Sequence, residues 1–123
     1  MKKPGILKIL GLVLAVFVGW SLHDYWAGAV VVSNEGLSFG WWPGQMRLSV
    51  LVWLVLLFYW WKAESWGIGL MLTGGGINLM DRWKLALVRD YWPFAGGGVY
   101  NNVADYLIGI GLFVFILELW RKK

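Results

Sequence analysis

The sequence has 123 residues, of which 59% are hydrophobic and 15% are charged. Soluble globular domains carry about 25% charged residues, so this composition excludes an ordinary soluble domain and indicates a membrane protein. The formal net charge is +4, but the basic residues bracket apolar runs instead of forming a stripe, which argues against nucleic acid as a partner. The chain has no cysteine, which excludes disulfide and thiol chemistry. The length fits one domain, residues 1–123.

Four apolar runs follow one another along the chain. They are Gly5–Leu22, Leu48–Trp61, Trp66–Met80 and Val103–Trp120. A spanning helix needs about 20 residues, so the two middle runs reach that length only with their flanks. Arg47 and Lys62 stand on those flanks, where long basic side chains can extend to the interface. We therefore predict an all-α membrane protein with four transmembrane helices.

The first run also resembles a cleavable signal peptide. A basic start, "MKK", precedes it, and the small residues Ala27–Ala29 follow it. The run is long for such a segment, however, and it contains Trp20. His23 and Asp24 also separate it from the small residues. We therefore interpret the run as a membrane span that is retained.

The distribution of basic residues predicts the orientation. If the N-terminus is cytoplasmic, four spans return the C-terminus to the same side. Seven of the 11 basic residues then lie inside and four lie outside, which agrees with the positive-inside rule. The polar residues that could act together gather at the outer side. They are Asp24, Asn34, Asp81, Asp90, Asn102 and Asp105.

The connections predict one small element of sheet. In the first outer loop, Asp24–Gln45, the β-branched "AVVVS" precedes the turn signal "NEG" and the alternating "LSFGW". We expect a short β-hairpin on the outer (periplasmic) face, with Pro43 breaking the chain before the second span. The inner connection, Lys62–Ser65, is tight, so spans two and three should pack as an antiparallel pair. The second outer connection reads as a loop with Pro93 and flexible glycines.

Two acidic residues are candidates for catalysis. Asp105 lies just inside the last apolar run, and a carboxylate within a membrane is costly and generally serves a function. Asp90 lies on the same side of the predicted membrane. If the two carboxyls meet, they share a proton because like charges repel at short range. One then acts as a general base toward water and the other as a general acid toward a carbonyl oxygen, which hydrolyses a peptide without a metal or a covalent intermediate.

A structural alternative uses the same residues, and spacing alone favours it. Asp90 would pair with Arg89 or Arg82, and Asp105 would cap the last helix. His23 is the only histidine, which is poor evidence for a metal site in a chain without cysteine. We therefore expect no metal and no cofactor. Serine hydrolase chemistry is unsupported, since no Gly-x-Ser-x-Gly motif is present.

The stretch "GGGINLMDR", Gly74–Arg82, places polar groups at the end of an apolar run. Consecutive glycines let another helix approach closely, and Asn78 is placed to form a hydrogen bond across helices. Asp81 and Arg82 are adjacent and therefore point in different directions, so each should pair elsewhere. The stretch predicts packing and bracing of a nearby site.

Four motifs, taken in order, resemble blocks of the signal peptidase II family. They are "NEGLSFG" (Asn34–Gly40), "GGGINLMDR" (Gly74–Arg82), "VRDYW" (Val88–Trp92) and "NVAD" (Asn102–Asp105). Asp24 is similar to the acidic residue that follows the first span in that family. Each block alone is weak, but their order on a four-span chain is specific.

The resemblance implies an aspartyl endopeptidase of the bacterial cytoplasmic (inner) membrane. It would cleave diacylglyceryl-modified prolipoproteins just before the lipidated cysteine, with Asp90 and Asp105 as the catalytic pair. The residues implied to support the site are Asn34, Gly36, Asn78, Arg82, Asn102 and Asp24. Its partners would be prolipoproteins and the phospholipid bilayer, and we expect a monomer. The alternative is a non-catalytic membrane scaffold or binding protein on the same fold.

Overall fold

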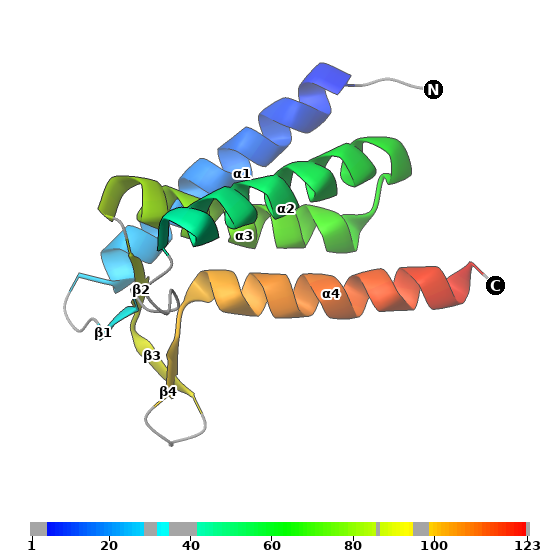
Figure 1. Ribbon diagram of the computed structural model, residues 1–123. Coiled ribbons are helices and arrows are strands. Elements are labelled where there is room, and N and C mark those ends of the chain that lie inside the picture. Colours follow the sequence, from blue (N-terminus) through cyan, green and yellow to red (C-terminus); the bar gives the residue numbers. More distant parts are fainter. Residues whose placement is uncertain (1–4, 29–31, 35–41, 86, 95–98, 123) are drawn as a thin grey trace.

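The computed structural model describes residues 5–28, 32–34, 42–85, 87–94 and 99–122. Its four helices are α1 (Gly5–Trp26), α2 (Trp42–Ala63), α3 (Trp66–Leu85) and α4 (Val103–Arg121). Figure 1 shows the start of α1 and the end of α4 at one end of the helix bundle, and the short strands at the other end. The described strands of the two predicted outer connections therefore lie at a single end of the bundle.

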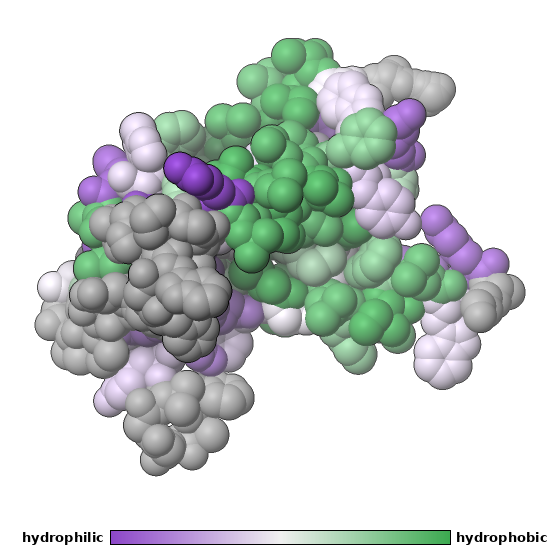
Figure 2. All heavy atoms as spheres, in the orientation of Figure 1, coloured by the Kyte–Doolittle hydropathy of each residue, from purple (hydrophilic) through white to green (hydrophobic). Residues whose placement is uncertain are grey.

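Three of these helices are long and apolar enough to cross a membrane. Within the described residues, they are Gly5–Trp26, Met46–Ala63 and Val103–Arg121. Figure 2 shows hydrophobic side chains spread over the helices, as expected of a surface that faces lipid. The chain is a multi-pass membrane protein by these criteria. Helix α3 has 20 residues but carries Arg82 and Lys84 in its last turn, so the prediction of a fourth span stays a prediction.

Helix α3 is the centre of the bundle, because it contacts α1, α2 and α4. A Cβ added to Gly74 would lie 2.6 Å from the backbone oxygen of Ala104 in α4, one on Gly75 would meet Trp53 of α2, and one on Gly76 would meet Val16 of α1. Successive helical residues point about 100° apart, so three consecutive glycines open three faces of α3. The predicted close helix packing is confirmed.

Two details of the helices differ from expectation. Helices α2 and α3 do pack together across the tight connection at Glu64 and Ser65, but α3 packs most extensively against α4. Pro43 does not break the chain before α2, since the helix begins at Trp42 and includes Pro43 in its first turn. Proline is tolerated there because its missing N–H has no partner within the helix.

The strands form two small antiparallel sheets. Strand β1 (Val32–Asn34) pairs with β2 (Val88–Asp90), and β3 (Trp92–Phe94) pairs with β4 (Val99–Asn101). The predicted strand in the first outer loop is therefore present, but its described partner is β2. The hairpin partner that we expected, residues 37–41, lies outside the described residues. The second outer connection is not a plain loop, because it supplies three of the four strands.

Candidate active site

The N-terminus of α4 begins with a capping box. Asn102 is the N-cap residue, and its Oδ1 accepts a 3.0 Å hydrogen bond from the backbone N–H of Asp105. In return, Asp105 Oδ2 accepts a 3.0 Å hydrogen bond from the backbone N–H of Asn102. These two bonds satisfy N–H groups that have no partner within a helix. Asp105 therefore caps α4, as the structural alternative predicted.

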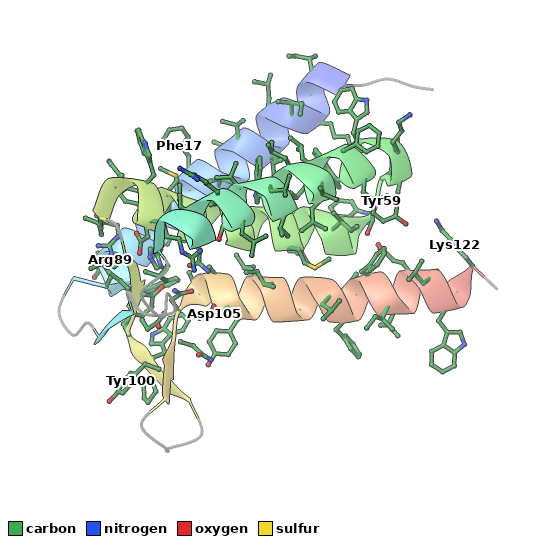
Figure 3. All side chains as sticks on the ribbon, viewed as in Figure 1. Phe17, Tyr59, Arg89, Tyr100, Asp105 and Lys122 are labelled. Atoms are coloured by element: carbon green, nitrogen blue, oxygen red, sulfur yellow. The ribbon has the colours of Figure 1, made fainter. Side chains whose placement is uncertain are left out.

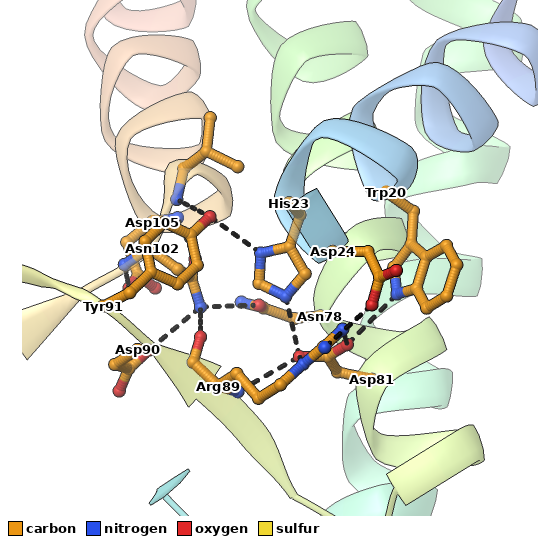
Figure 4. Close-up of polar contacts among 11 residues, drawn as sticks. Trp20, His23, Asp24, Asn78, Asp81, Arg89, Asp90, Tyr91, Asn102 and Asp105 are labelled. Atoms are coloured by element: carbon orange, nitrogen blue, oxygen red, sulfur yellow. Dashed lines mark hydrogen bonds and ion pairs between the residues drawn. The ribbon is translucent and has the colours of Figure 1, made fainter. Parts of the chain in front are cut away.

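The side-chain amide of Asn102 joins three other segments to this cap. Its Nδ2 lies 2.9 Å from Asp90 Oδ1 in β2, 3.0 Å from the backbone oxygen of Arg89 and 3.2 Å from Asn78 Oδ1 in α3. Asn102 is fully buried. The expected hydrogen bond of Asn78 across helices is thus present. Asp90 and Asp105 both accept hydrogen bonds from Asn102, which brings the two acidic side chains to the same residue (Figure 4).

Arg82 supplies positive charge near both acidic residues. It lies in the last turn of α3 and is half-buried. Its guanidinium interacts electrostatically with Asp105, Asp90 and Asp81. A cation placed in this way lowers the repulsion between carboxylates that approach one another. Arg82 therefore lies within electrostatic reach of both acidic residues, and the supporting role that the resemblance implies for it stays a prediction.

The remaining predicted site residues belong to the end of α1 and to the first outer loop that follows it. Asn34 ends β1, where its backbone stands opposite Val88 of β2. Gly36 lies outside the described residues. Asp24 lies at the end of α1 and is half exposed, with Oδ1 2.8 Å from Arg89 Nη1. Asp24 therefore reaches the site through Arg89.

A second polar cluster surrounds Asp81. This carboxylate is fully buried, and Oδ1 accepts hydrogen bonds from Trp20 Nε1 at 3.1 Å and from Arg89 Nη2 at 2.8 Å. Its Oδ2 lies 2.7 Å from His23 Nε2. Asp81 therefore pairs away from its neighbour Arg82, as predicted. Arg89 forms one ion pair with Asp81 and another with Asp24, so it connects the two acidic residues. Figure 3 shows Arg89 at the strand end of the bundle, far from Lys122.

Two groups of the outer connection have shifted pKa values. The pKa of Arg89 is raised, first by its hydrogen bonds to Asp81 and then by those to Asp24. Burial raises the pKa of Tyr91 to about 12. Arg89 therefore stays charged and Tyr91 keeps its hydroxyl proton over the whole neutral range.

His23 is the site residue that sequence reasoning missed. It was considered only as a metal ligand, whereas the structure buries it fully between Asp81 and Tyr91. A signal was present, since Trp20, His23 and Asp24 have the i, i+3 and i+4 spacing of one helix face. All three contact Asp81 or Arg89. In the described part of the chain, no three His, Cys, Asp or Glu side chains are grouped to hold a metal ion.

A model of the family described as "Signal peptidase (SPase) II" matches residues 6–121. The chain belongs to this family. A protein of Halothermothrix orenii named lipoprotein signal peptidase is 35% identical over 101 residues, which cover 75% of this chain and 69% of the relative. One of Bartonella bacilliformis with the same name is 26% identical, with 93% of this chain and 89% of the relative covered.

Solved structures show the same fold. A bacterial membrane enzyme determined at 1.9 Å resolution matches with a TM-score of 0.76 and 18% identity, covering 94% of this chain and 93% of its own. A second, determined at 2.3 Å, matches with a TM-score of 0.73 and 18% identity, covering 92% of this chain and 87% of its own. The fold of these membrane enzymes is therefore shared over nearly the whole chain.

Proposed function

We propose that this chain is an intramembrane aspartyl endopeptidase that cleaves the signal peptides of diacylglyceryl-modified prolipoproteins just before the lipidated cysteine. The observation that carries the proposal is the pair of hydrogen bonds from Asn102, one to Asp90 and one to Asp105. Relatives named lipoprotein signal peptidase support the substrate class. The apolar helix surfaces suit a substrate that arrives through the lipid.

The chemistry follows from two carboxyls with one proton between them. The ionised carboxylate takes a proton from water, and the resulting nucleophile attacks the scissile carbonyl carbon. The protonated carboxyl gives its proton to the carbonyl oxygen, which forms a neutral tetrahedral diol. When the C–N bond breaks, a proton moves to the leaving amine. The signal peptide leaves with a new carboxyl group and the lipidated cysteine with a free amino group, so no metal or covalent intermediate is needed.

The membrane placement is part of the proposal. Helix α3 would also cross the membrane, which gives four spans in all. Both chain ends would then face the cytoplasm of a bacterial cell, as the excess of basic residues at that end of the bundle favours. The cluster around Asn102 would then lie near the outer face of the inner membrane. The protein would act as a monomer.

The decisive experiment compares two conservative variants with a remote control. Asp90→Asn and Asp105→Asn keep the shape and an acceptor oxygen but remove the acid or the base. Glu64→Gln makes the same chemical change at an exposed position in the α2–α3 connection. Purified protein in detergent is given a diacylglyceryl-modified prolipoprotein, and the released signal peptide is measured. We expect both Asp variants to lose cleavage by about 10³-fold or more while Glu64→Gln keeps it.

A non-catalytic scaffold is the second candidate, because the helix cap gives Asp105 a structural role even without catalysis. Under that alternative, the wild-type protein releases no signal peptide. Asp105→Asn would then change only the stability of α4, by about 1 kcal/mol, which is the scale of one helix cap. If either Asp variant cleaves at the wild-type rate, Asp90 and Asp105 are not the catalytic pair.

A further inference from the structure

We propose that His23 is a positioning residue that fixes both carboxyls of the site through Tyr91. The inference rests on the proposed function, and it concerns a hydrogen-bonded relay that runs from Asp81 through His23 and Tyr91 to Val103 (Figure 4). Three segments of the chain supply the relay. They are the end of α1, the end of α3, and the outer connection with the start of α4.

The donors and acceptors of the relay can be assigned consistently. The backbone N–H of Val103 donates to Tyr91 Oη at 3.1 Å. The hydroxyl proton of Tyr91 is then directed to His23 Nδ1 at 2.9 Å. Nδ1 therefore accepts, and the imidazole proton sits on Nε2, from which it is donated to Asp81 Oδ2 at 2.7 Å. Every polar atom of the relay is satisfied when the imidazole proton is placed on Nε2.

The relay starts from a fixed anchor. Asp81 is also held by Arg89 and by Trp20 Nε1. Neither His23 nor Asp81 is exposed to solvent, and Tyr91 is 6% exposed. In such surroundings a hydrogen bond is strong, and water has no access to replace one that is removed. The position of the imidazole ring is therefore set by α3.

The relay ends at the two acidic residues. Tyr91 follows Asp90 directly in the chain, and its backbone N–H donates to the carbonyl oxygen of Asn101 at 2.9 Å. Its hydroxyl holds Val103, the first residue of α4, two residues before Asp105. Tyr91 thus holds the segment that carries Asp90 against the start of α4, which carries Asp105. Catalysis is sensitive to displacements well below 1 Å, so loss of this brace should lower turnover more than binding.

Two substitutions of His23 separate the two ends of the relay. In His23→Gln, the side-chain amide occupies the position of Nε2 and can still donate a hydrogen bond to Asp81, but the hydrogen bond with Tyr91 is lost. The amide oxygen of His23→Asn stands near the place of Nδ1 and can still accept from Tyr91, whereas it loses Asp81. We expect His23→Gln to lower kcat about tenfold with KM changed less than about twofold. His23→Asn keeps the contact with Tyr91 but loses the anchor on Asp81, so it should lower kcat less than His23→Gln does and also lower the unfolding temperature.

A double-mutant cycle with Tyr91→Phe tests the route through the tyrosine hydroxyl. Tyr91→Phe should lower kcat about as much as His23→Gln, and the double variant should be no slower than either single variant, because one link has been broken twice. Tyr25→Phe, which removes a hydroxyl from a side chain that is 79% exposed at the same end of α1, is the matched control. Effects of His23→Gln and Tyr91→Phe that simply multiply would overturn the relay, as would wild-type kcat in His23→Gln.

Amide hydrogen exchange provides a readout that does not need the peptidase activity. The Val103 N–H should exchange faster in His23→Gln and in Tyr91→Phe than in the wild type, and His23→Asn should speed its exchange less, while Tyr25→Phe leaves its protection unchanged. If the wild type cleaves no prolipoprotein, the proposed function is wrong and this exchange pattern alone decides the relay. Unchanged protection of Val103 in His23→Gln overturns it, whatever the activity.

Discussion

Asn102 donates a 2.9 Å hydrogen bond from its side-chain amide to Asp90 while its side-chain oxygen caps α4. The two functions of this side chain use opposite ends of the same amide group. Because the cap fixes the rotation of the amide, it also fixes the direction from which Asp90 is held. The capping box and the acidic pair are therefore one structure, and the capping role of Asp105 does not compete with a catalytic role.

Substitution of Asn102 can separate these two functions. Aspartate caps helices as well as asparagine does, so Asn102→Asp keeps the cap but turns a carboxylate oxygen toward Asp90. We expect Asn102→Asp to lose cleavage at least 100-fold through this repulsion. Asn102→Ala removes the cap as well and should lower stability by about 1–3 kcal/mol. Turnover and unfolding temperature are measured for both variants, and an Asn102→Asp variant with normal turnover would show that Asn102 is only a cap.

The helices could be predicted from the sequence because each depends on a long run of neighbouring residues. Helix α1 was expected at Gly5–Leu22 and is observed at Gly5–Trp26. The extra turn contains His23, whose buried ring forms hydrogen bonds with Asp81 and Tyr91. Helix boundaries that depend on such distant partners cannot be read from the apolar pattern alone.

The strands of the outer connection could not be predicted in the same way. Each has three residues, which is too short for an alternating pattern to be recognised. Pro93 also argued for a loop, although it lies in β3, where only one neighbouring strand is paired. The pairing of β1 with β2 joins residues more than 50 positions apart. Local sequence patterns carry no information about which distant strands pair.

The glycines of α3 and α4 predict unequal effects of substitution by alanine. A Cβ at Gly74 would lie 2.6 Å from the Ala104 oxygen, and one at Gly67 would lie 2.4 Å from the Phe115 nitrogen, while Gly109 faces open space. Gly74→Ala and Gly67→Ala should each lower stability by about 1–3 kcal/mol. Gly109→Ala should be neutral or stabilise by up to about 1 kcal/mol. Thermal unfolding in detergent measures all three.

Activity should distinguish the two destabilising glycine variants. Gly74 faces the first turn of α4, so Gly74→Ala moves Asp105 away from Asp90. Gly67 contacts α4 close to its other end. We expect Gly74→Ala to lower kcat at a temperature where both variants are folded, and Gly67→Ala to keep it. Equal losses of kcat would mean that α4 shifts as a rigid body.

Tyr91 predicts a loss of stability at alkaline pH. Its pKa is raised by burial from 10.0 to about 12 in the folded protein. The folded state therefore keeps a proton that the unfolded state loses between these pH values, and the stabilisation is present below pH 10 and disappears as the pH rises to about 12. The unfolding temperature of wild type and of Tyr91→Phe is compared at pH 9 and at pH 11.5. The difference in unfolding temperature between wild type and Tyr91→Phe should be smaller at the higher pH. The difference between wild type and Tyr25→Phe should not change with pH.

The two ion pairs of Arg89 should contribute very differently to stability, although both have a 2.8 Å contact. The side chain of Asp24 is 52% exposed, whereas that of Asp81 is not exposed at all. Asp24→Asn should cost at most about 1 kcal/mol, and added salt should abolish that cost. Asp81→Asn leaves Arg89 without its buried counter-charge and should cost about 3–5 kcal/mol at any salt concentration. Thermal unfolding at low and high salt measures both, and similar costs for the two variants would mean that water reaches Asp81.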